Sequence, residues 1–198
     1  SWARDVYKRQ VLNAMNGTGF AIVGFLGIFA LRWLALRYGK RQAMCCVLLL
    51  TAIGGVSKWF IFTPEYPHLL LLDAVLNGPV WVSLGVIVPS MIADLCDWDE
   101  HKFGERREGV ISSVFTWITK FGTSFTFLVS GVALYFSGFD ESLGADQPDG
   151  TITTLRLFFV GASVLAPVLA IFSLKLYGIT EDSAYSIRKE LEARRGEV

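Results

Sequence analysis

Lys120 is the residue whose chemistry is hardest to explain by packing alone. It lies about 11 residues into a long apolar stretch, which as a helix places it about 16 Å from the start of that helix. On insertion scales a Lys at the centre of a bilayer costs about 2.5–3.5 kcal/mol, and such residues face a bundle interior or a watery cavity. We therefore interpret Lys120 as part of a polar path through a membrane protein.

The neighbours of Lys120 on the same helical face carry hydroxyl groups. Ser113, Thr116, Thr123 and Ser124 stand seven and four residues before it and three and four after it. We expect a stripe in which Lys120, Thr116, Ser113 and Thr123 bind a substrate and the hydroxyls donate to its oxygens. Hydrogen bonding between helices by Ser and Thr, which is common in membrane bundles, is the alternative.

A second candidate region is interrupted by glycine and proline. The segment Asn77-Gly78-Pro79 and the later Pro89 predict kinks, and such helices mark sites in transporters. Trp81 follows the first break and is a candidate platform for a sugar ring, although packing against lipid or another helix explains it equally well. We expect Asp73 to be an interfacial residue, with pairing to a cation such as Lys58 as the alternative.

Apolar runs long enough to cross a bilayer make up most of the chain. The 198 residues are 53% hydrophobic, with a mean hydropathy of +0.47. Only 18% are charged, against about 25% in soluble domains. Since about 20 apolar residues cross the hydrocarbon core as a helix, we predict an all-α membrane protein. Its transmembrane helices number about five and cover residues 12–36, 43–62, 68–93, 109–137 and 152–177.

Polar segments set the expected domain organisation. The opening SWARDVYKRQ is unlike the rest, so we expect 1–10 to be a non-native or disordered start, 11–177 the transmembrane bundle and 178–198 a cytoplasmic tail with a short surface helix over 186–191. The positive-inside rule places the C-terminus in the cytoplasm. The side expected to be cytoplasmic collects Arg32, Arg37, Lys40, Arg41, Lys102, Arg106, Arg107, Lys175, Arg188, Lys189, Arg194 and Arg195. The opposite side collects Lys58, Arg156, Arg4, Lys8 and Arg9.

Several other classes of function lack support in the sequence. The net charge of zero gives no basic patch for nucleic acid. The cysteines Cys45, Cys46 and Cys96 and the histidines His68 and His101 have no metal-ligand or disulfide spacing, so no metal site is expected. The HExxH and GxSxG motifs are absent, and we expect no enzyme.

A dense run of charges follows the third span. It reads DLCDWDEHK from Asp94, and Gly104, Arg106 and Glu108-Gly109 follow. By composition, residues 94–108 form a solvated loop. Asp94, Asp97 and Asp99 are closely spaced, but the Asp-x-Asp-x-Asp-Gly order and the closing Glu of a calcium loop are missing.

This run, its spacing to Lys120 and the Ile179-Thr180 start of the tail carry a resemblance. They resemble a region of the glycoside–pentoside–hexuronide:cation symporters, a family of the major facilitator superfamily. The region is the loop between helices ten and eleven, together with the residues around it. The resemblance implies a fold of twelve helices in two bundles, of which this chain would be the C-terminal part, with helices eight to twelve.

The family resemblance also implies roles for particular residues. Lys120 would lie beside the sugar and cation sites, and Thr116 would line the sugar pocket. Asp94 and Asp97, with Arg106 nearby, would belong to a cytoplasmic gate that contacts the other half of the protein. The pocket tryptophan of the family falls on Gly85 here, so a substrate other than melibiose is expected. The coupling ion would be Na⁺ or H⁺, and no cofactor would be bound.

The leading hypothesis is therefore cation-coupled symport of a sugar or glycoside by alternating access, in the bacterial inner membrane. The expected partners are the small-molecule substrate, membrane lipid and the missing N-terminal half. Two alternatives stay open: a major facilitator transporter with another cargo, such as a lysolipid or a drug, and a membrane subunit that transports nothing.

Overall fold

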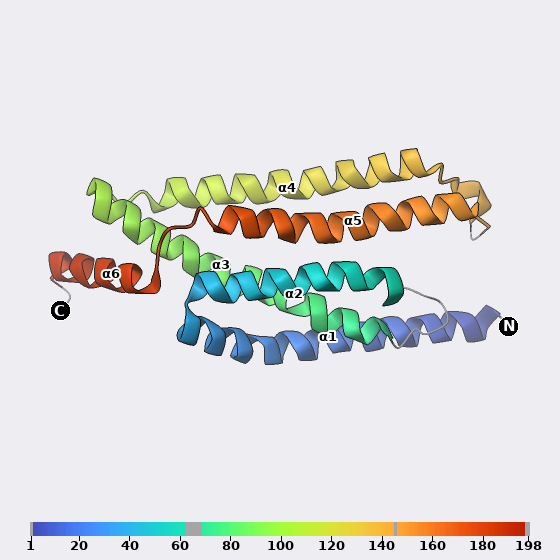
Figure 1. The fold of residues 1–198 in the computed structure, drawn as a ribbon, viewed down its shortest axis with the longest axis horizontal. Helices are drawn as coiled ribbons and strands as arrows, with labels where there is room; N and C mark the ends of the chain where they lie inside the picture. The colour runs from blue at the N-terminus through green and yellow to red at the C-terminus, as the bar shows by residue number, and fades with distance from the viewer. Residues whose placement is uncertain (1, 62–68, 145, 197–198) are drawn as a thin grey trace.

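The computed structural model describes the backbone of residues 2–61, 69–144 and 146–196, and the side chains of these except residues 2–16, 70, 71, 149 and 195. Six α-helices, one short 3-10 helix and no strand form within these ranges (Figure 1). In chain order they are α1 (Trp2–Tyr38), α2 (Lys40–Ile61), α3 (Leu70–Phe103), α4 (Glu108–Ser137), η2 (Glu141–Leu143), α5 (Asp149–Leu174) and α6 (Glu181–Arg195). The all-α prediction is confirmed.

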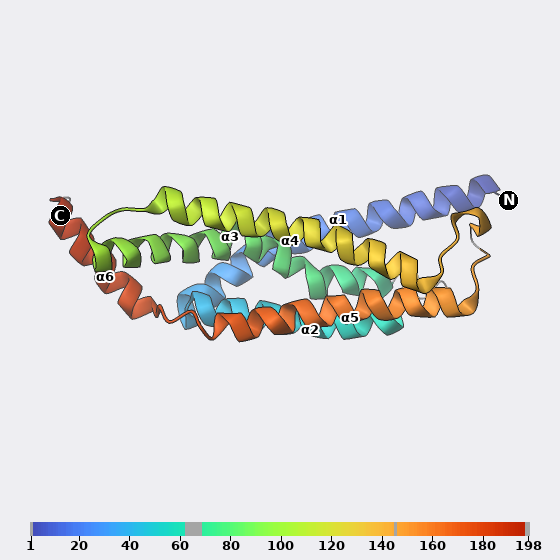
Figure 2. The ribbon, with the colours of Figure 1, turned by 90° about the horizontal axis from the view of Figure 1, so that it is seen from above.

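The five long helices run along the length of the molecule, and α6 lies across one end (Figures 1 and 2). We call this the α6 end; it also contains the turn between α1 and α2 and the C-terminal part of α3. Helix α2 packs against both α3 and α5, and α1 packs against α3. Helix α4 contacts α5, and its buried residues are Ala133 and Ser137, near its C-terminus. The first half of α4 is therefore exposed.

Each of the five predicted spans lies for most of its length in one long helix. Residues 62 and 68, at the ends of two of these spans, lie outside the described residues, and α5 ends at Leu174, before the predicted end at 177. In the residues described, four helices are long and apolar enough to cross a membrane: Gly17–Tyr38, Lys40–Ile61, Leu72–Phe103 and Gly150–Leu174. Helix α4 is as long as these but is not among them, because Lys120 and its many Ser and Thr residues lower its mean hydropathy. The polar residues that mark α4 as a candidate site are thus the residues that lower its hydropathy below that of the other long helices.

Two glycines allow α2 to approach its neighbours closely. A Cβ atom on Gly54 would lie 2.7 Å from the side-chain nitrogen of Asn77 on α3. A Cβ atom on Gly55 would lie 2.7 Å from the main-chain oxygen of Ser163 on α5. Without side chains at these positions, α2 is in contact with α3 on one side and with the backbone of α5 on the other.

The prediction of a loop over residues 94–108 is wrong for most of its length. Helix α3 continues through this charged run to Phe103 and ends at Gly104, whose φ of 75° is left-handed and whose N–H donates to Glu100 O. Only 104–107 connect α3 to α4. Composition suggested a loop, but the carboxylates of this segment find cationic partners from other parts of the chain, as described below.

Other boundaries differ less. Helix α1 begins at Trp2, so helical backbone runs through most of the segment 1–10 that the sequence sets apart. Helix α3 passes through Pro79 and Pro89 as one element rather than breaking at the first. The predicted surface helix over 186–191 is confirmed and extends to Glu181–Arg195. It begins with a capping box in which Thr180 and Ser183 exchange hydrogen bonds between side chain and backbone.

Candidate functional site

Lys120 lies on the exposed first half of α4. It stands 12 residues after Glu108, about 18 Å along the helix. Its ammonium group forms no hydrogen bond or ion pair with any residue that the structure describes. The cation is therefore available to a group that this part of the chain does not supply.

An open hollow surrounds Lys120 on the surface of α4. Five residues line its volume of about 380 Å³: Ser112, Ser113, Thr116, Trp117 and Lys120. The spacing of Ser113, Thr116, Trp117 and Lys120 places them on one face, three and four residues apart. The structure thus brings three of the predicted site residues together and adds two that sequence reasoning missed, Ser112 and Trp117.

The hydroxyl groups of this face already use their hydrogens. Ser113 Oγ donates to Gly109 O at 2.7 Å, and Thr116 Oγ1 donates to Ser112 O at 2.8 Å. Thr123 Oγ1 likewise donates to the carbonyl one turn earlier, at 3.0 Å. Such bonds leave the oxygen lone pairs free. The hydroxyls of Ser113, Thr116 and Thr123 can therefore accept hydrogen bonds from a ligand, rather than donate them as the sequence suggested, and Lys120 is the charged donor of the hollow.

Trp117 begins a ladder of aromatic rings along one flank of this face. Its ring stacks on that of Phe121 with centroids 5.7 Å apart and 16° between the planes. Phe121 in turn stacks on Phe125 at 6.4 Å and 17°. The spacing of four residues brings these side chains together on a helix, so an apolar stripe lies next to the polar one.

The remaining predicted residues of the substrate site lie elsewhere. Thr123 is on α4 but does not line the hollow. Trp81 is 69% exposed on α3 and does not line it either. Asp73 is buried and accepts a hydrogen bond of 2.6 Å from Asn77, whereas Lys58 donates to Ser163 at 3.4 Å. Asp73 is therefore neither an exposed interfacial residue nor, among the contacts described, a partner of Lys58.

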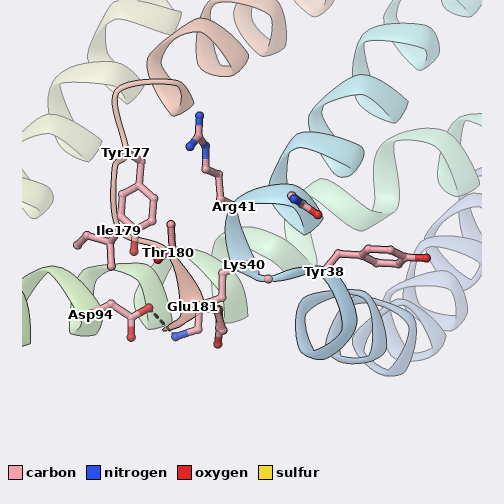
Figure 3. Close-up of a pocket in the computed structure, with 10 residues that line it drawn as sticks. Tyr38, Lys40, Arg41, Asp94, Tyr177, Ile179, Thr180 and Glu181 are labelled. Carbon is pink, nitrogen blue, oxygen red and sulfur yellow. Dashed lines mark hydrogen bonds and ion pairs between the residues drawn. The ribbon is translucent and has the colours of Figure 1, made fainter. Parts of the chain in front are cut away.

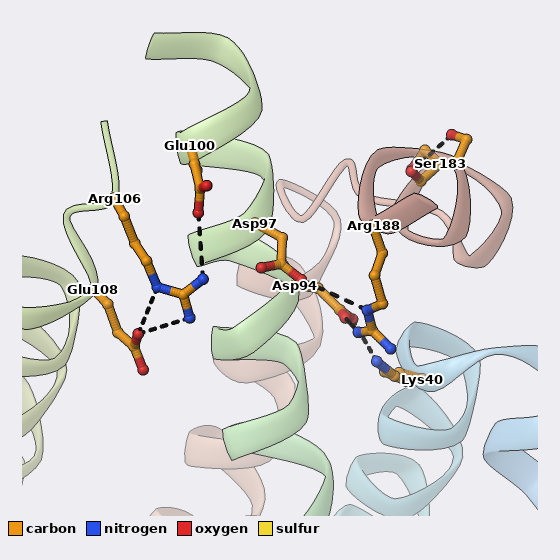
Figure 4. A network of polar contacts seen from close by, with 9 residues as sticks. Lys40, Asp94, Asp97, Glu100, Arg106, Glu108, Ser183 and Arg188 are labelled. Carbon is orange, nitrogen blue, oxygen red and sulfur yellow. Dashed lines mark hydrogen bonds and ion pairs between the residues drawn. The ribbon is translucent and has the colours of Figure 1, made fainter. Parts of the chain in front are cut away.

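A second polar cluster occupies the α6 end (Figure 4). The carboxylate of Asp94, only 3% exposed, lies 2.6 Å from Lys40 Nζ and 3.3 Å from Arg188 Nη2. Arg188 also approaches Asp97, at 3.7 Å. Asp94 thus joins the first residue of α2, the body of α3 and the tail helix α6. Sequence reasoning did not connect these residues, because Lys40 and Arg188 are far from Asp94 in the chain.

The same cluster holds the connection between α3 and α4. Arg106 pairs with Glu108 at 2.9 Å and Glu100 at 3.3 Å, and Arg107 pairs with Asp99 at 2.6 Å. The hydrogen bond to Glu108 raises the pKa of Arg106, and the one to Asp99 raises the pKa of Arg107. Asp94, Asp99 and Arg106 therefore all form ion pairs within this chain. The predicted gate residues Asp94, Asp97 and Arg106 lie on or beside the last turns of α3.

A small cavity of about 140 Å³ adjoins the Asp94 cluster (Figure 3). It lies where the turn from α1 to α2 meets α3 and the segment that leads to α6. Its lining consists of Tyr38, Gly39, Lys40, Arg41, Gln42, Asp94, Tyr177, Ile179, Thr180 and Glu181. Burial, together with the charges of Asp94 and then Glu181, raises the pKa of Tyr177 to about 12. The hydroxyl of Tyr177 donates a hydrogen bond of 3.5 Å to the main-chain oxygen of Met91.

The bundle of long apolar helices and the polar face of α4 define the class of this chain as a helical membrane protein. The family model described as "MFS/sugar transport protein" matches residues 2–181. The chain therefore belongs to this family of the major facilitator type, and the resemblance inferred from its residues is confirmed at the family level.

Three relatives illustrate the range of the family. The chain is 29% identical over 166 residues to the isoprimeverose transporter of Lactiplantibacillus pentosus, covering 81% of this chain and 33% of that protein. It is 24% identical over 195 residues to an Escherichia coli K12 protein named as a candidate sulfoquinovose importer, covering 96% of this chain and 41% of that protein. It is 25% identical over 172 residues to the mouse sodium-dependent lysophosphatidylcholine symporter 1, covering 84% of this chain and 31% of that protein. The chain spans between about a third and two fifths of these relatives.

Proposed function

We propose that this chain forms the C-terminal helices of a secondary active transporter that moves a sugar or glycoside together with a cation. The hollow on α4 carries this proposal, because it combines an unpaired ammonium group with hydroxyl oxygens about halfway along a long helix. In a bilayer such a face needs a partner other than lipid. A hydrated substrate between two bundles would provide one.

Each group of the hollow has a role in binding a sugar. Lys120 donates hydrogen bonds to sugar oxygens. The hydroxyls of Ser113 and Thr116 donate to the helix backbone and so accept from sugar hydroxyls. A sugar hydroxyl is both donor and acceptor, so this mixed lining satisfies it better than a lining of donors alone.

The same proposal gives the α6 end a place in alternating access. By the positive-inside rule this end faces the cytoplasm, together with the C-terminus. Asp94, Asp97 and Arg106 then lie at the inner gate. The coupling ion is Na⁺ or H⁺, bound by acidic residues outside this chain. Rocking of the two bundles exposes the hollow first to one side of the membrane and then to the other.

Transport by the full-length protein in membrane vesicles tests the proposal. Uptake of isoprimeverose, sulfoquinovose and melibiose is measured with Na⁺ and pH gradients imposed separately. We expect one gradient to drive uptake of at least one sugar, and Lys120→Ala to reduce it by about tenfold or more, which is about 1.4 kcal/mol. Lys175→Ala, at the end of α5, is the matched control. Uptake by Lys120→Ala at the rate of the control contradicts the role of Lys120, and absence of gradient-driven sugar uptake contradicts the proposed function.

A lysolipid is the second candidate cargo. The similarity to the mouse symporter favours it, and the rings of Trp117, Phe121 and Phe125 give an apolar stripe for an acyl chain. Lysophosphatidylcholine is therefore included among the substrates of the same assay. Its uptake in the absence of any sugar uptake would favour this alternative.

A further inference from the structure

We propose that Trp117 is the stacking platform of the transport site and that the site is built for a cyclic sugar. This inference rests on the proposed function and narrows it. It assigns the substrate a rigid ring with one apolar face, rather than an open-chain polyol or an acyl chain.

The position of Trp117 carries the first part of the argument. It lines the hollow together with Lys120 and Thr116, and it is 66% exposed. It stands three residues before Lys120, about 4.5 Å along the helix axis. The indole ring and the ammonium group therefore flank the same small volume, one offering an apolar face and the other a donor.

The ladder behind Trp117 carries the second part. Stacking on Phe121, with planes only 16° apart, favours one orientation of the indole ring, and Phe121 is itself stacked on Phe125. A pre-oriented aromatic ring loses less conformational freedom when a ligand binds than a free one does. The ladder thus supports the platform without entering the hollow, since neither Phe121 nor Phe125 lines it.

The chemistry of the lining selects the class of ligand. A sugar ring has C–H groups on one face, which suit an aromatic ring, and hydroxyls at its edge, which suit Lys120, Ser113 and Thr116. An acyl chain would leave these polar groups without partners, which is unfavourable away from water. An open-chain polyol has no fixed apolar face to lay on Trp117.

Trp33 provides a control within the same chain. It is 56% exposed on α1 and does not line the hollow around Lys120. If the exposed tryptophans serve only to contact lipid or other helices, removing either should have the same effect. If Trp117 stacks on the substrate, only its removal should weaken binding of the substrate.

The experiment compares Trp117→Ala, Trp117→Phe and Trp33→Ala in the full-length transporter. KM and kcat are measured for the transported sugar, and xylose is compared with its open-chain alcohol xylitol. We expect Trp117→Ala to raise KM by about tenfold or more with kcat little changed, and Trp117→Phe to raise it by about threefold or less, because a ring is retained. Trp33→Ala should leave KM unchanged, and xylitol should not compete for uptake.

A second measurement covers the case in which Trp117→Ala does not fold. In Ser113→Cys, a conservative change in the hollow, the rate of alkylation of the new thiol should fall when the cyclic sugar is added and not when xylitol is added. Equal protection by both, or an unchanged KM in a folded Trp117→Ala, overturns the inference while gradient-driven uptake still supports the proposed function. If no sugar is transported by the unmodified protein, both proposals fail.

Discussion

Replacing Asp94 by Asn should loosen the docking of the tail helix α6 on the bundle. Asp94 is the one carboxylate in the described structure that pairs with both α2 and α6, through Lys40 and Arg188. Helix α6 has 15 residues, and an isolated helix of this length is marginal in water. Its folding therefore depends on docking, which buries Ile187 and Leu191 and is supported by the pair between Arg188 and Asp94.

The size of the effect follows from burial and distance. The bond from Lys40 to Asp94 is short, at 2.6 Å, and both groups are largely buried, so it contributes about 1.5–3 kcal/mol. Arg188 is half-exposed, and its pair with Asp94 contributes about 0–1 kcal/mol. The pair with Lys40 joins α2 to α3, and only the pair with Arg188 holds α6. We therefore expect Asp94→Asn to weaken docking of α6 by up to about 1 kcal/mol, which is up to about a fivefold larger undocked population. Asp97→Asn, which removes only the 3.7 Å contact to Arg188, should change this population by less than Asp94→Asn does.

Hydrogen exchange of the α6 amides, followed by mass spectrometry on the full-length protein, measures this population. Exchange over residues 181–195 should accelerate by up to about fivefold in Asp94→Asn, while exchange in α4 serves as the internal reference. Asp97→Asn is the matched control. Equal exchange of α6 in the two variants, or no acceleration in Asp94→Asn, would show that apolar packing alone holds the tail.

Two further predictions concern packing and titration. Gly55→Ala should lower the unfolding temperature in detergent, with a loss of about 1–3 kcal/mol, because the new methyl group meets the backbone of Ser163, whereas Gly161→Ala has open space and should be neutral. Tyr177 has a pKa raised to about 12 in the folded protein, above its usual value of 10. The stability that Tyr177 contributes is therefore present in full below about pH 10 and is lost as the pH rises through about 12. The difference in absorbance titration between the unmodified protein and Tyr177→Phe should show phenolate formation near pH 12; a transition near pH 10 would contradict the burial of this hydroxyl.

The extents of the helices could be predicted because the signal is local. Apolar runs of membrane length identify a helix wherever they occur, and five such runs gave five helices. The end of α3 could not be predicted in this way. Residues 94–103 are charged and look like a loop in isolation, but their carboxylates are neutralised by Lys40, Arg107 and Arg188. These partners come together only in the folded chain.

The candidate site was predicted in part, because only the residues that share one helix have a spacing that the sequence shows. Lys120, Thr116 and Ser113 were found because their spacing on one helix is readable from the sequence. Trp117 shares this spacing, at three residues before Lys120, and a search that included aromatic residues on the face would have found it. Trp81 lies on another helix, and no local pattern tells whether two helices bring their side chains to the same hollow.

The two prolines of α3 give this long helix a mechanical property that its continuous shape conceals. Proline has no N–H group, so Pro79 and Pro89 each leave a carbonyl four residues earlier, at Val75 and Gly85, without its usual helical donor. Bending at these two points breaks no hydrogen bond that the straight helix possessed. Helix α3 can thus act as three short rods joined end to end, and the last of them, which bears Asp94, would move together with α6 and with the Lys40 end of α2.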